Sequence, residues 1–209
     1  MFDNQTSIKP LIRVIDDDMA MRKSWTFIIE GEGWDTVGYA DALAFLSSGN
    51  WTRPGCILLD VRMPHMSGLE LQLKLREMGC DLPIIFISGH GDIDMAVHTL
   101  KHGAADFLTK PVSDQRLLEA IEAAVSRNIA YRRNNEQVSA FRSRLEQLTQ
   151  REREVIRMVA HGFANKEVAR EFGISEKTVQ VHRGSAYRKL NIHNAAEIAR
   201  LLILSGDPL

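Results

Sequence analysis

Cysteine is scarce in this sequence of 209 residues, and the 2 that it contains form no recognisable pattern. Cys56 and Cys80 make neither a Cys-x-x-Cys pair nor a zinc-binding spacing. Cys56 lies inside an apolar run, which predicts a small buried hydrophobe. A disulfide framework is therefore not expected.

The sequence also has no apolar stretch of transmembrane length and no basic or apolar leader. Its first residues, Met1 to Gln5, are neither basic nor apolar, which argues against a secretory signal. It shows no internal repeat and no low-complexity tract. With 44% hydrophobic and 25% charged residues, we expect a globular cytoplasmic protein without a membrane partner.

Neither sign of charge is in clear excess, but the balance differs between the two halves. The net charge is -1, yet residues 1–126 hold 11 Lys+Arg against 18 Asp+Glu, and residues 127–209 hold 15 against 9. An acidic half followed by a basic half predicts two domains, the second of which meets a polyanion. Charge alone leaves open the alternative of a solvated basic surface.

Strand-like and helix-like segments alternate through the first half of the chain. The apolar runs predict strands at 11–15, 35–39, 56–59, 83–88 and 105–108. The segments between and after them predict helices at 19–32, 41–48, 67–78, 92–102 and 113–127. Five such units in series predict an α/β fold with a five-stranded, doubly wound parallel sheet.

Polar side chains of different chemical kinds follow four of these strands. They comprise several carboxylates, a hydroxyl and an ammonium group, carried by Asp16, Asp17, Asp18, Asp60, Ser88 and Lys110. The carboxyl ends of parallel strands lie along one edge of the sheet, where sites are built in open α/β folds. The sequence therefore predicts a site at this edge.

The residue types at this edge indicate an aspartate that accepts a phosphoryl group. Asp16 and Asp17 supply hard oxygen ligands for a divalent metal, which offsets the repulsion between a carboxylate and a phosphate. Asp60 is the predicted acceptor, with the Lys110 ammonium and the Ser88 hydroxyl beside the phosphoryl oxygens. A cis bond before Pro111 could aim the lysine. The alternatives are an acidic helix cap at 16–18 and an ordinary turn at Ser88.

No strand signal remains after Thr149. A capping box from Thr149 to Glu152 predicts a helix at 150–161, and caps at Asn165, Ser175 and Asn194 predict helices at 166–172, 176–190 and 195–204. Residues 127–147 are predicted to be a helical linker that can continue the preceding helix. Its apolar stripe could pack on either domain or on a second copy; the stripe comprises Val138, Phe141, Leu145 and Leu148.

Two of these helices are separated by a turn that suits a DNA-binding motif. The segment Gly173-Ile174-Ser175 supplies a stop, an apolar anchor and a cap between the helices 166–172 and 176–190. In such a motif the second helix reads base edges while flanking cations hold phosphates. A purely structural four-helix bundle is the alternative.

The first half resembles the receiver domain of two-component response regulators. The motifs that carry the resemblance occur in order over residues 11–125: Val14-Ile15-Asp16-Asp17-Asp18, Leu59-Asp60-Val61-Arg62-Met63-Pro64-His65-Met66-Ser67-Gly68, Ile87-Ser88-Gly89-His90-Gly91-Asp92 and Phe107-Leu108-Thr109-Lys110-Pro111. The resemblance implies a flavodoxin-like sheet order, Mg²⁺ as cofactor and a sensor histidine kinase as partner.

The resemblance also implies a role for individual residues. Asp60 would take phosphate from the kinase, and Mg²⁺ would be held by Asp16, Asp17, Asp60 and the backbone carbonyl of Arg62. Ser88 and Phe107 would be the switch pair that rearranges the face around 92–109, where such receivers dimerise. From their place in the motifs, we hypothesise that the side chains of Arg62 and His90 set the phosphate lifetime by controlling water access.

The second half resembles the LuxR-type helix-turn-helix over about 145–205. The matching segments are Leu148-Thr149-Gln150-Arg151-Glu152-Arg153-Glu154-Val155, Gly162-Phe163-Ala164-Asn165-Lys166-Glu167-Val168-Ala169, Ile174-Ser175-Glu176-Lys177-Thr178-Val179-Gln180-Val181-His182-Arg183 and Lys189-Leu190. By position, the residues that would face bases are Gln180, Val181 and Gly184. Those that would lie near phosphates are Lys166, Thr178, Arg183, Arg188 and Lys189.

Together the two halves resemble a transcriptional regulator of the FixJ/NarL class. This implies a receiver at 8–126, a linker at 127–147 and a DNA-binding domain at 148–206. The protein would not be an enzyme; once phosphorylated it would form a homodimer, bind double-stranded promoter DNA and work with RNA polymerase. The last helix would pair two DNA-bound copies, or simply pack on its own domain, through Ile198, Leu201, Leu202 and Leu204. The alternatives are a metal-dependent phosphohydrolase and a helical module that binds protein or RNA.

Overall fold

The computed structural model describes residues 8–89 and 93–206. By its internal contacts the chain divides into two compact units, Met1–Arg132 and Arg133–Leu209. Within the described ranges, no helix combines the length and the apolar character that crossing a membrane requires. Each unit has its own apolar core, so each is described by itself.

The first unit is built on a parallel sheet whose strands are the apolar runs of the sequence. The described residues form five strands in the order β2-β1-β3-β4-β5, with bounds β1 Leu11–Ile15, β2 Asp35–Tyr39, β3 Gly55–Asp60, β4 Ile84–Ser88 and β5 Asp106–Thr109. This is the doubly wound order of the flavodoxin-like fold, in which the chain reverses direction across the sheet between β1 and β3. The predicted α/β fold class is confirmed, with the less apolar β2 at an edge.

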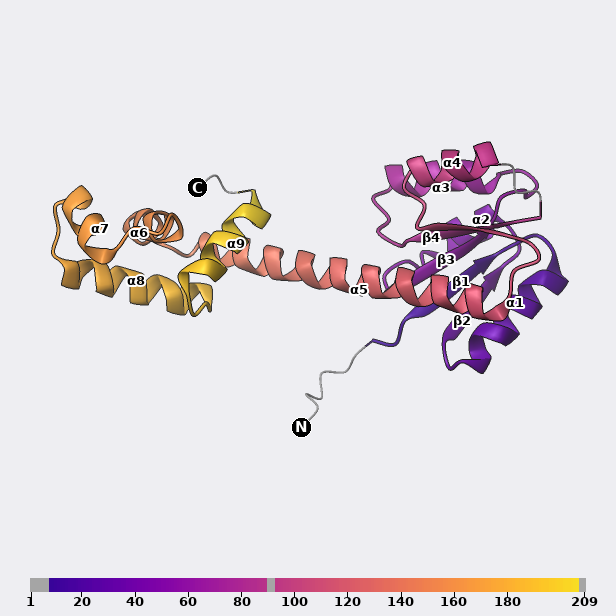
Figure 1. Ribbon diagram of the computed structural model, residues 1–209, viewed down its shortest axis with the longest axis horizontal. Coiled ribbons are helices and arrows are strands. Elements are labelled where there is room, and N and C mark those ends of the chain that lie inside the picture. Colours follow the sequence, from indigo (N-terminus) through magenta and orange to yellow (C-terminus); the bar gives the residue numbers. More distant parts are fainter. Residues whose placement is uncertain (1–7, 90–92, 207–209) are drawn as a thin grey trace. The chain divides into compact units, whose positions relative to one another are not determined.

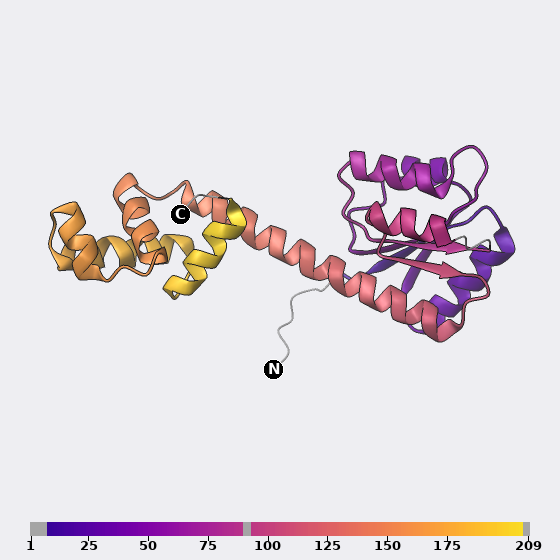
Figure 2. The same cartoon turned by 45° about the horizontal axis from the view of Figure 1, so that its top comes forward.

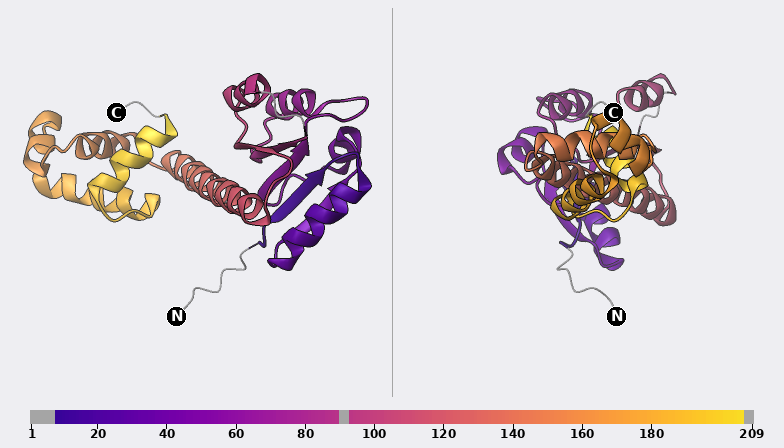
Figure 3. Two further views of the ribbon diagram at one scale, coloured as in Figure 1. Left: turned by 45° about the vertical axis from the view of Figure 1, so that its right-hand side comes forward. Right: turned by 90° about the vertical axis from the view of Figure 1, so that its left-hand side faces the viewer.

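Helices cover both faces of this sheet (Figures 1 and 3). Helix α1, Met19–Gly31, and the first part of α5, Asp114–Leu145, bury one face through a core that includes Ile12, Leu58 and Ile121. Helices α2, Ala42–Ser48, α3, Gly68–Glu77, and α4, Ile93–Lys101, cover the other face around Phe45 and Phe86. Because strands β1, β3 and β4 are buried on both sides, their carboxyl ends are held firmly at one edge.

Helix α5 runs without interruption over Asp114–Leu145, so the predicted helix and the predicted helical linker are one element. In the first unit, Asn128 is 3% exposed, and its side chain joins the backbone of Gly55 to that of Asp81. Arg132 adds an ion pair of 2.6 Å with the Asp81 carboxylate. These contacts fix α5 to the first unit up to Arg132, the residue at which that unit ends.

The second unit contains only helices within its described residues (Figure 2). They are α6, Gln150–Ala160, α7, Asn165–Phe172, α8, Glu176–Leu190, and α9, Ala195–Ser205. The side chains of Thr149, Ser175 and Asn194 cap α6, α8 and α9 as predicted. The predicted cap at Asn165 is wrong: α7 starts at that residue, and the Glu167 carboxylate accepts from the backbone N–H of Ala164 instead, at 2.8 Å.

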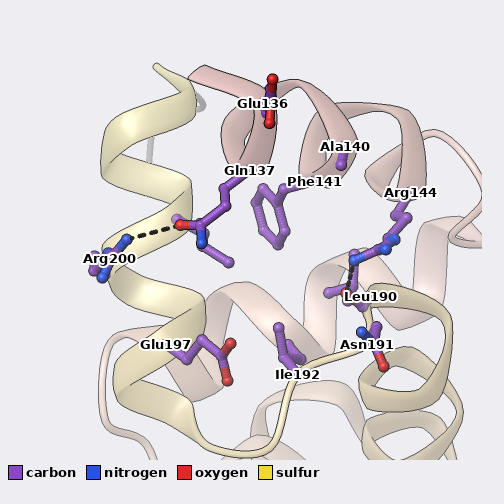
Figure 4. Close-up of a pocket in the computed structure, with 11 residues that line it drawn as sticks. Glu136, Gln137, Ala140, Phe141, Arg144, Leu190, Asn191, Ile192, Glu197 and Arg200 are labelled. Carbon is purple, nitrogen blue, oxygen red and sulfur yellow. Dashed lines mark hydrogen bonds between the residues drawn. The ribbon is translucent and has the colours of Figure 1, made fainter. Parts of the chain in front are cut away.

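The apolar stripe at the end of α5 packs into the core of the second unit. Phe141, which is 1% exposed, lies beside a pocket of about 470 Å³ near α9 (Figure 4). Leu145 and Leu148 belong to the same core. Most of the predicted pairing residues of α9 do as well, because Ile198, Leu201 and Leu202 are buried. Of that set Leu204 is exposed, so intradomain packing accounts for the other three.

Candidate phosphoacceptor site and nucleic-acid interface

The carboxylates predicted at the sheet edge come together in the structure. Asp16 directly follows β1 and Asp60 ends β3, and these strands pair in parallel through Ile15 and Leu59. Carboxylate oxygens of Asp16, Asp17 and Asp60 all lie within 4.8 Å of one another. This arrangement at the point where the sheet order reverses offers hard oxygen ligands to a divalent cation.

The three consecutive aspartates have different surroundings. Asp18 is the N-cap of α1, and its carboxylate accepts from the backbone N–H groups of Ala20 and Met21. Asp16 is 3% exposed and accepts from the backbone N–H of Asp18 at 2.9 Å, which leaves its other oxygen facing the cluster. The cap and the carboxylate cluster therefore coexist, with each carried by a different aspartate.

Lys110 brings its ammonium group to these carboxylates. Its Nζ lies 3.2 Å from Oδ2 of Asp16 and 3.8 Å from Oδ2 of Asp60. The Lys110 backbone N–H donates to the carbonyl of Ser88 at 2.8 Å, which ties the segment after β5 to the end of β4. The bond between Lys110 and Pro111 is cis, as the sequence allowed.

The surroundings of Asp60 disfavour the negative charge of its carboxylate. Burial raises the pKa of its carboxyl above the ordinary value; Lys110 lowers it, and Asp16 raises it again. One oxygen accepts from the backbone N–H of Val61 at 2.8 Å. A single ammonium shared among the carboxylates leaves this edge negative, so the site favours a cation or a group that neutralises Asp60.

Arg22, on α1, is a contributor that the sequence analysis missed. Its guanidinium donates to the backbone carbonyls of Asp16 at 2.5 Å and Asp17 at 3.1 Å. Both bonds hold the acidic segment from behind, through its backbone. The spacing of an arginine one turn and a half beyond an aspartate pair was the only available signal, and surface arginines often show it without any such role.

The predicted switch residues lie on β4 and β5, the two strands that follow β3 in the sheet. Ser88 ends β4 and is 2% exposed. Phe107 is half-buried in β5, with its ring centroid 6.4 Å from that of Phe86. Arg62 is exposed two residues after Asp60, and His90 lies outside the described residues.

Helices α7 and α8 form the predicted helix-turn-helix. Gly173 ends α7 in the left-handed conformation, at φ 64°, and Ser175 then caps α8 by accepting from the backbone N–H of Thr178. Val168, Val179 and other apolar side chains of the two helices are buried in the shared core. Helix α8 is therefore held by one face, and its opposite face is free for a partner.

The exposed face of α8 carries all three residues that the resemblance placed at bases. Side chains three or four positions apart share a face of a helix. Glu176 is exposed at the first position of the helix, and beyond it the exposed residues are Lys177, Gln180, Val181, Gly184 and Arg188. Val181 is 63% exposed although it is apolar. We call these five residues the α8 stripe.

The other predicted phosphate contacts differ in how available they are. Lys166 is exposed near the start of α7, whereas Thr178 is half-buried with its Oγ1 2.8 Å from Oγ of Ser175. Arg183 donates to the Asn165 side chain at 3.2 Å and lies over the ring of Tyr187. Lys189 pairs with the buried carboxylate of Glu152 at 2.7 Å.

Glu152 joins α6 to α8 and was recognised from sequence only as a capping residue. Its carboxylate is 5% exposed and accepts from Nζ of Lys189 at 2.7 Å, Oγ of Ser185 at 2.6 Å and the backbone N–H of Thr149 at 2.8 Å. Burial acts to raise the pKa of Glu152, but these hydrogen bonds outweigh it and lower the pKa to about 2. The group is a satisfied carboxylate that links the two helices.

Two family models match the chain, one in each unit. The response regulator receiver domain matches residues 12–122, and the luxR family of bacterial regulatory proteins matches residues 146–202. The first contains the acidic cluster, and the second contains the helix-turn-helix with the α8 stripe.

Relatives share both parts in the same order. The response regulator protein TodT of Pseudomonas putida is 42% identical over 199 residues, which cover 95% of this chain and 88% of TodT. The transcriptional regulatory protein FixJ of Azorhizobium caulinodans is 40% identical over 195 residues, covering 93% of this chain and 92% of FixJ. The solved structure of the response regulator StyR is 38% identical with a TM-score of 0.78, covering 93% of this chain and 98% of StyR.

The fold and the carboxylate edge define a receiver, and the second unit defines a DNA-binding output domain. The chain belongs to the two-component response regulators that join a receiver domain to a LuxR-type helix-turn-helix domain, the FixJ/NarL class. It is a transcriptional response regulator, and the family to which it belongs acts on DNA.

Proposed function

We propose that Asp60 accepts a phosphoryl group from a phosphohistidine of a sensor histidine kinase. A carboxylate oxygen of Asp60 attacks phosphorus, and a phosphorus–oxygen bond forms as the phosphorus–nitrogen bond to the kinase histidine breaks. The departing imidazole nitrogen keeps the electron pair of that bond. The observation that carries this proposal is the meeting of Asp16, Asp17 and Asp60 within 4.8 Å beside Lys110.

The carboxylate cluster fits Mg²⁺, which prefers oxygen ligands and needs only one or two carboxylates. Asp16, Asp17, Asp60 and the backbone carbonyl of Arg62 would hold the ion. When bound, it would neutralise charge between the acceptor carboxylate and the incoming phosphoryl oxygens. Lys110 would then be released from its contact with Asp16 to serve a phosphoryl oxygen, which a flexible ammonium side chain can reach.

Phosphorylation would then shift the receiver between two states. The Ser88 hydroxyl would hydrogen-bond a phosphoryl oxygen at the end of β4, and Phe107 would turn toward the space beside it. Its ring already borders the core at Phe86, so a change at Ser88 alters the packing of the neighbouring strand. The α4 and β5 face would then favour a homodimer, while Arg62 and His90 would set the lifetime of the phosphate.

The output of this switch would be promoter binding in the cytoplasm. A dimer places two α8 helices on paired half-sites of double-stranded DNA, where RNA polymerase is then engaged. Base contacts would come from Gln180, Val181 and Gly184, and phosphate contacts from Lys166, Thr178, Arg183, Arg188 and Lys189. In this proposal residues 8–126 are the receiver, 127–147 the linker and 148–206 the DNA-binding domain, and the only chemistry is self-modification at Asp60.

The test is a selection of random duplex DNA by the full chain, with Mg²⁺, in the presence and absence of a small acyl-phosphate donor. A two-fold repeated site enriched more strongly with donor is expected for the wild type, and Asp60→Ala should lose the donor effect while it stays folded. Asp18→Asn is the matched control, because it removes a neighbouring charge but keeps a good helix cap. Donor-dependent enrichment that survives Asp60→Ala would contradict the proposal.

A further inference from the structure

The middle of the α8 stripe carries residues that the fold does not explain. Val181 is 63% exposed, whereas Val179, Ala186 and Leu190 on the opposite face of the helix are buried. A β-branched apolar side chain gains nothing from exposure in a helix and loses rotamer freedom there. Its presence on this face therefore points to a partner that covers it.

Gly184 is the second unexplained residue. Glycine is the least favourable residue in a helix interior after proline, and here its backbone does not need a positive φ. A Cβ built at Gly184 would meet nothing within 4 Å, so neither packing nor a close approach within the domain requires its absence. The reason for a glycine at this position therefore lies in what the helix contacts outside the domain.

The charges of α8 are arranged around this middle part. Within the α8 stripe, the cations Lys177 and Arg188 lie at the two ends, and the acidic Glu176 precedes the stripe at the start of the helix. The other two cations, Arg183 and Lys189, lie outside the stripe, where Arg183 donates to the side chain of Asn165 and Lys189 donates to the carboxylate of Glu152. The centre of the stripe is thus uncharged, with phosphate-binding groups flanking it.

An uncharged centre has a direct meaning for base recognition. Guanine is usually read by arginine or lysine, which bond O6 and N7, whereas glutamine can bond N6 and N7 of adenine and an apolar side chain can contact the thymine methyl group. Gln180 and Val181 provide these two adenine- and thymine-type contacts. Gly184 lies one turn beyond both, so a side chain there would stand beside them and hold the helix away from the base edges.

We propose that Gln180, Val181 and Gly184 form a neutral reading surface that selects A·T pairs at the centre of each half-site, and that glycine at 184 permits the close approach this requires. The inference rests on the proposed DNA-binding role of α8 and adds the class of sequence that it recognises. Phosphate contacts at the ends of the stripe position the helix, and the neutral centre specifies the base pairs.

The experiment compares the full-length wild type with Gly184→Ala and Gln180→Lys in duplex selection, followed by affinity measurements on the selected duplex. The wild type should enrich A·T pairs at adjoining central positions. Gly184→Ala should bind that duplex at least tenfold more weakly, although its thermal unfolding midpoint rises and its non-specific binding at low salt is unchanged. Gln180→Lys should move the preference at one position toward guanine.

Gly31→Ala is the matched control, because Gly31 is another helical glycine whose added Cβ would meet nothing within 4 Å. It should bind DNA as the wild type does. Conserved G·C pairs at the centre of the half-sites would overturn the A·T assignment, and undiminished affinity of Gly184→Ala would overturn the close approach. If no duplex were enriched by any protein, the DNA-binding function itself would fail, which separates that result from a failure of this inference alone.

Discussion

Two carboxylates, one in each unit of the chain, are held in opposite ways: Glu152 is buried, and Asp60 is half-buried. Glu152 in the helical unit receives an ammonium, a hydroxyl and a backbone N–H, and its pKa falls to about 2. Asp60 in the receiver receives one backbone N–H and shares a lysine at 3.8 Å, and burial beside Asp16 raises its pKa. The first carboxylate is saturated, and the second is short of partners.

The number of hydrogen-bond and ion-pair partners distinguishes a structural carboxylate from a reactive one. A saturated carboxylate has nothing to gain from a new ligand, so it links helices and stays as it is. A carboxylate that lacks partners is relieved by a cation or by conversion to another group. The same residue chemistry therefore serves stability in the helical unit and phosphoryl acceptance in the receiver.

The change with the greatest predicted consequence is the loss of covalent modification at Asp60. Asp60→Asn should lose all acyl phosphate after incubation with Mg²⁺ and a small phosphodonor, because the acceptor oxygen is gone. Glu152→Gln should be phosphorylated as the wild type is. Intact-protein mass spectrometry measures both, and a phosphate that remains in Asp60→Asn would show that another residue is the acceptor.

The next effect concerns stability and belongs to the helical unit. Glu152→Gln should lower the free energy of unfolding of that unit by about 2 kcal/mol, because it removes charge-assisted hydrogen bonds at a buried carboxylate. Denaturant unfolding followed by circular dichroism measures it. Glu154→Gln is the control. Glu154 likewise pairs with a cation, Arg151 on the same helix, but it is half-buried at the surface. Equal losses in both variants would contradict a special role for Glu152.

The same residue predicts a pH dependence. The pKa of Glu152 is lowered to about 2 in the folded protein, so the ionised form stabilises the fold. That stability is present above about pH 4.5, the ordinary glutamate range, and is lost as the pH falls toward 2. Across this pH window, the thermal unfolding midpoint of the helical unit should fall more steeply with decreasing pH in the wild type than in Glu152→Gln. Parallel curves for the two proteins would show that Glu152 does not titrate as described.

A smaller effect is expected at Arg22, which holds the acidic segment through its backbone. Arg22→Lys keeps the positive charge but cannot bridge the carbonyls of Asp16 and Asp17, so Mg²⁺ should bind several-fold more weakly. Isothermal titration with Mg²⁺ measures the change. Lys23→Ala, at the next and exposed position of α1, should bind as the wild type does. Unchanged affinity in Arg22→Lys would mean that the carboxylates are placed without it.

The smallest effect is a gain of stability where Asp60 is neutralised. Because the pKa of Asp60 is raised, its ionisation destabilises the folded receiver, and stability falls as the pH rises through that pKa. Asp60→Asn should therefore unfold at a higher temperature than the wild type at neutral pH without Mg²⁺. The gain in its free energy of unfolding should be smaller than the loss expected for Glu152→Gln. A lower unfolding temperature would show that the charge at Asp60 is adequately compensated.

Much of this molecule could be predicted from local patterns. The apolar runs at 56–59 and 84–87 became buried strands, and Thr149, Ser175 and Asn194 became helix caps, because each signal acts within a few residues. The pattern failed at Asn165, where a glutamate three residues into the segment satisfied the backbone N–H and the helix began one position earlier.

Contacts across long stretches of sequence could not be predicted in this way. Arg13 interrupts an apolar strand, yet it is fully buried and donates to the carbonyls of Leu11, Asn50 and Arg53, while burial lowers its pKa to about 10. Asn50 and Arg53 belong to a loop that only the fold brings near. Gly55 is needed at the same place, because a Cβ there would lie 1.9 Å from the carbonyl oxygen of Leu11.

The order of strands and helices along the chain and the set of groups at the strand ends follow from sequence patterns, because side-chain periodicity and the shared edge of parallel strands are local rules. Which charged groups form pairs inside a domain and which stay exposed depends on the folded arrangement. Lys189 and Arg188 are neighbours in sequence, but Lys189 pairs with Glu152 in the core and Arg188 is exposed on the α8 stripe. The physical reason is that the availability of a charge depends on the groups packed around it, and those come from distant parts of the chain.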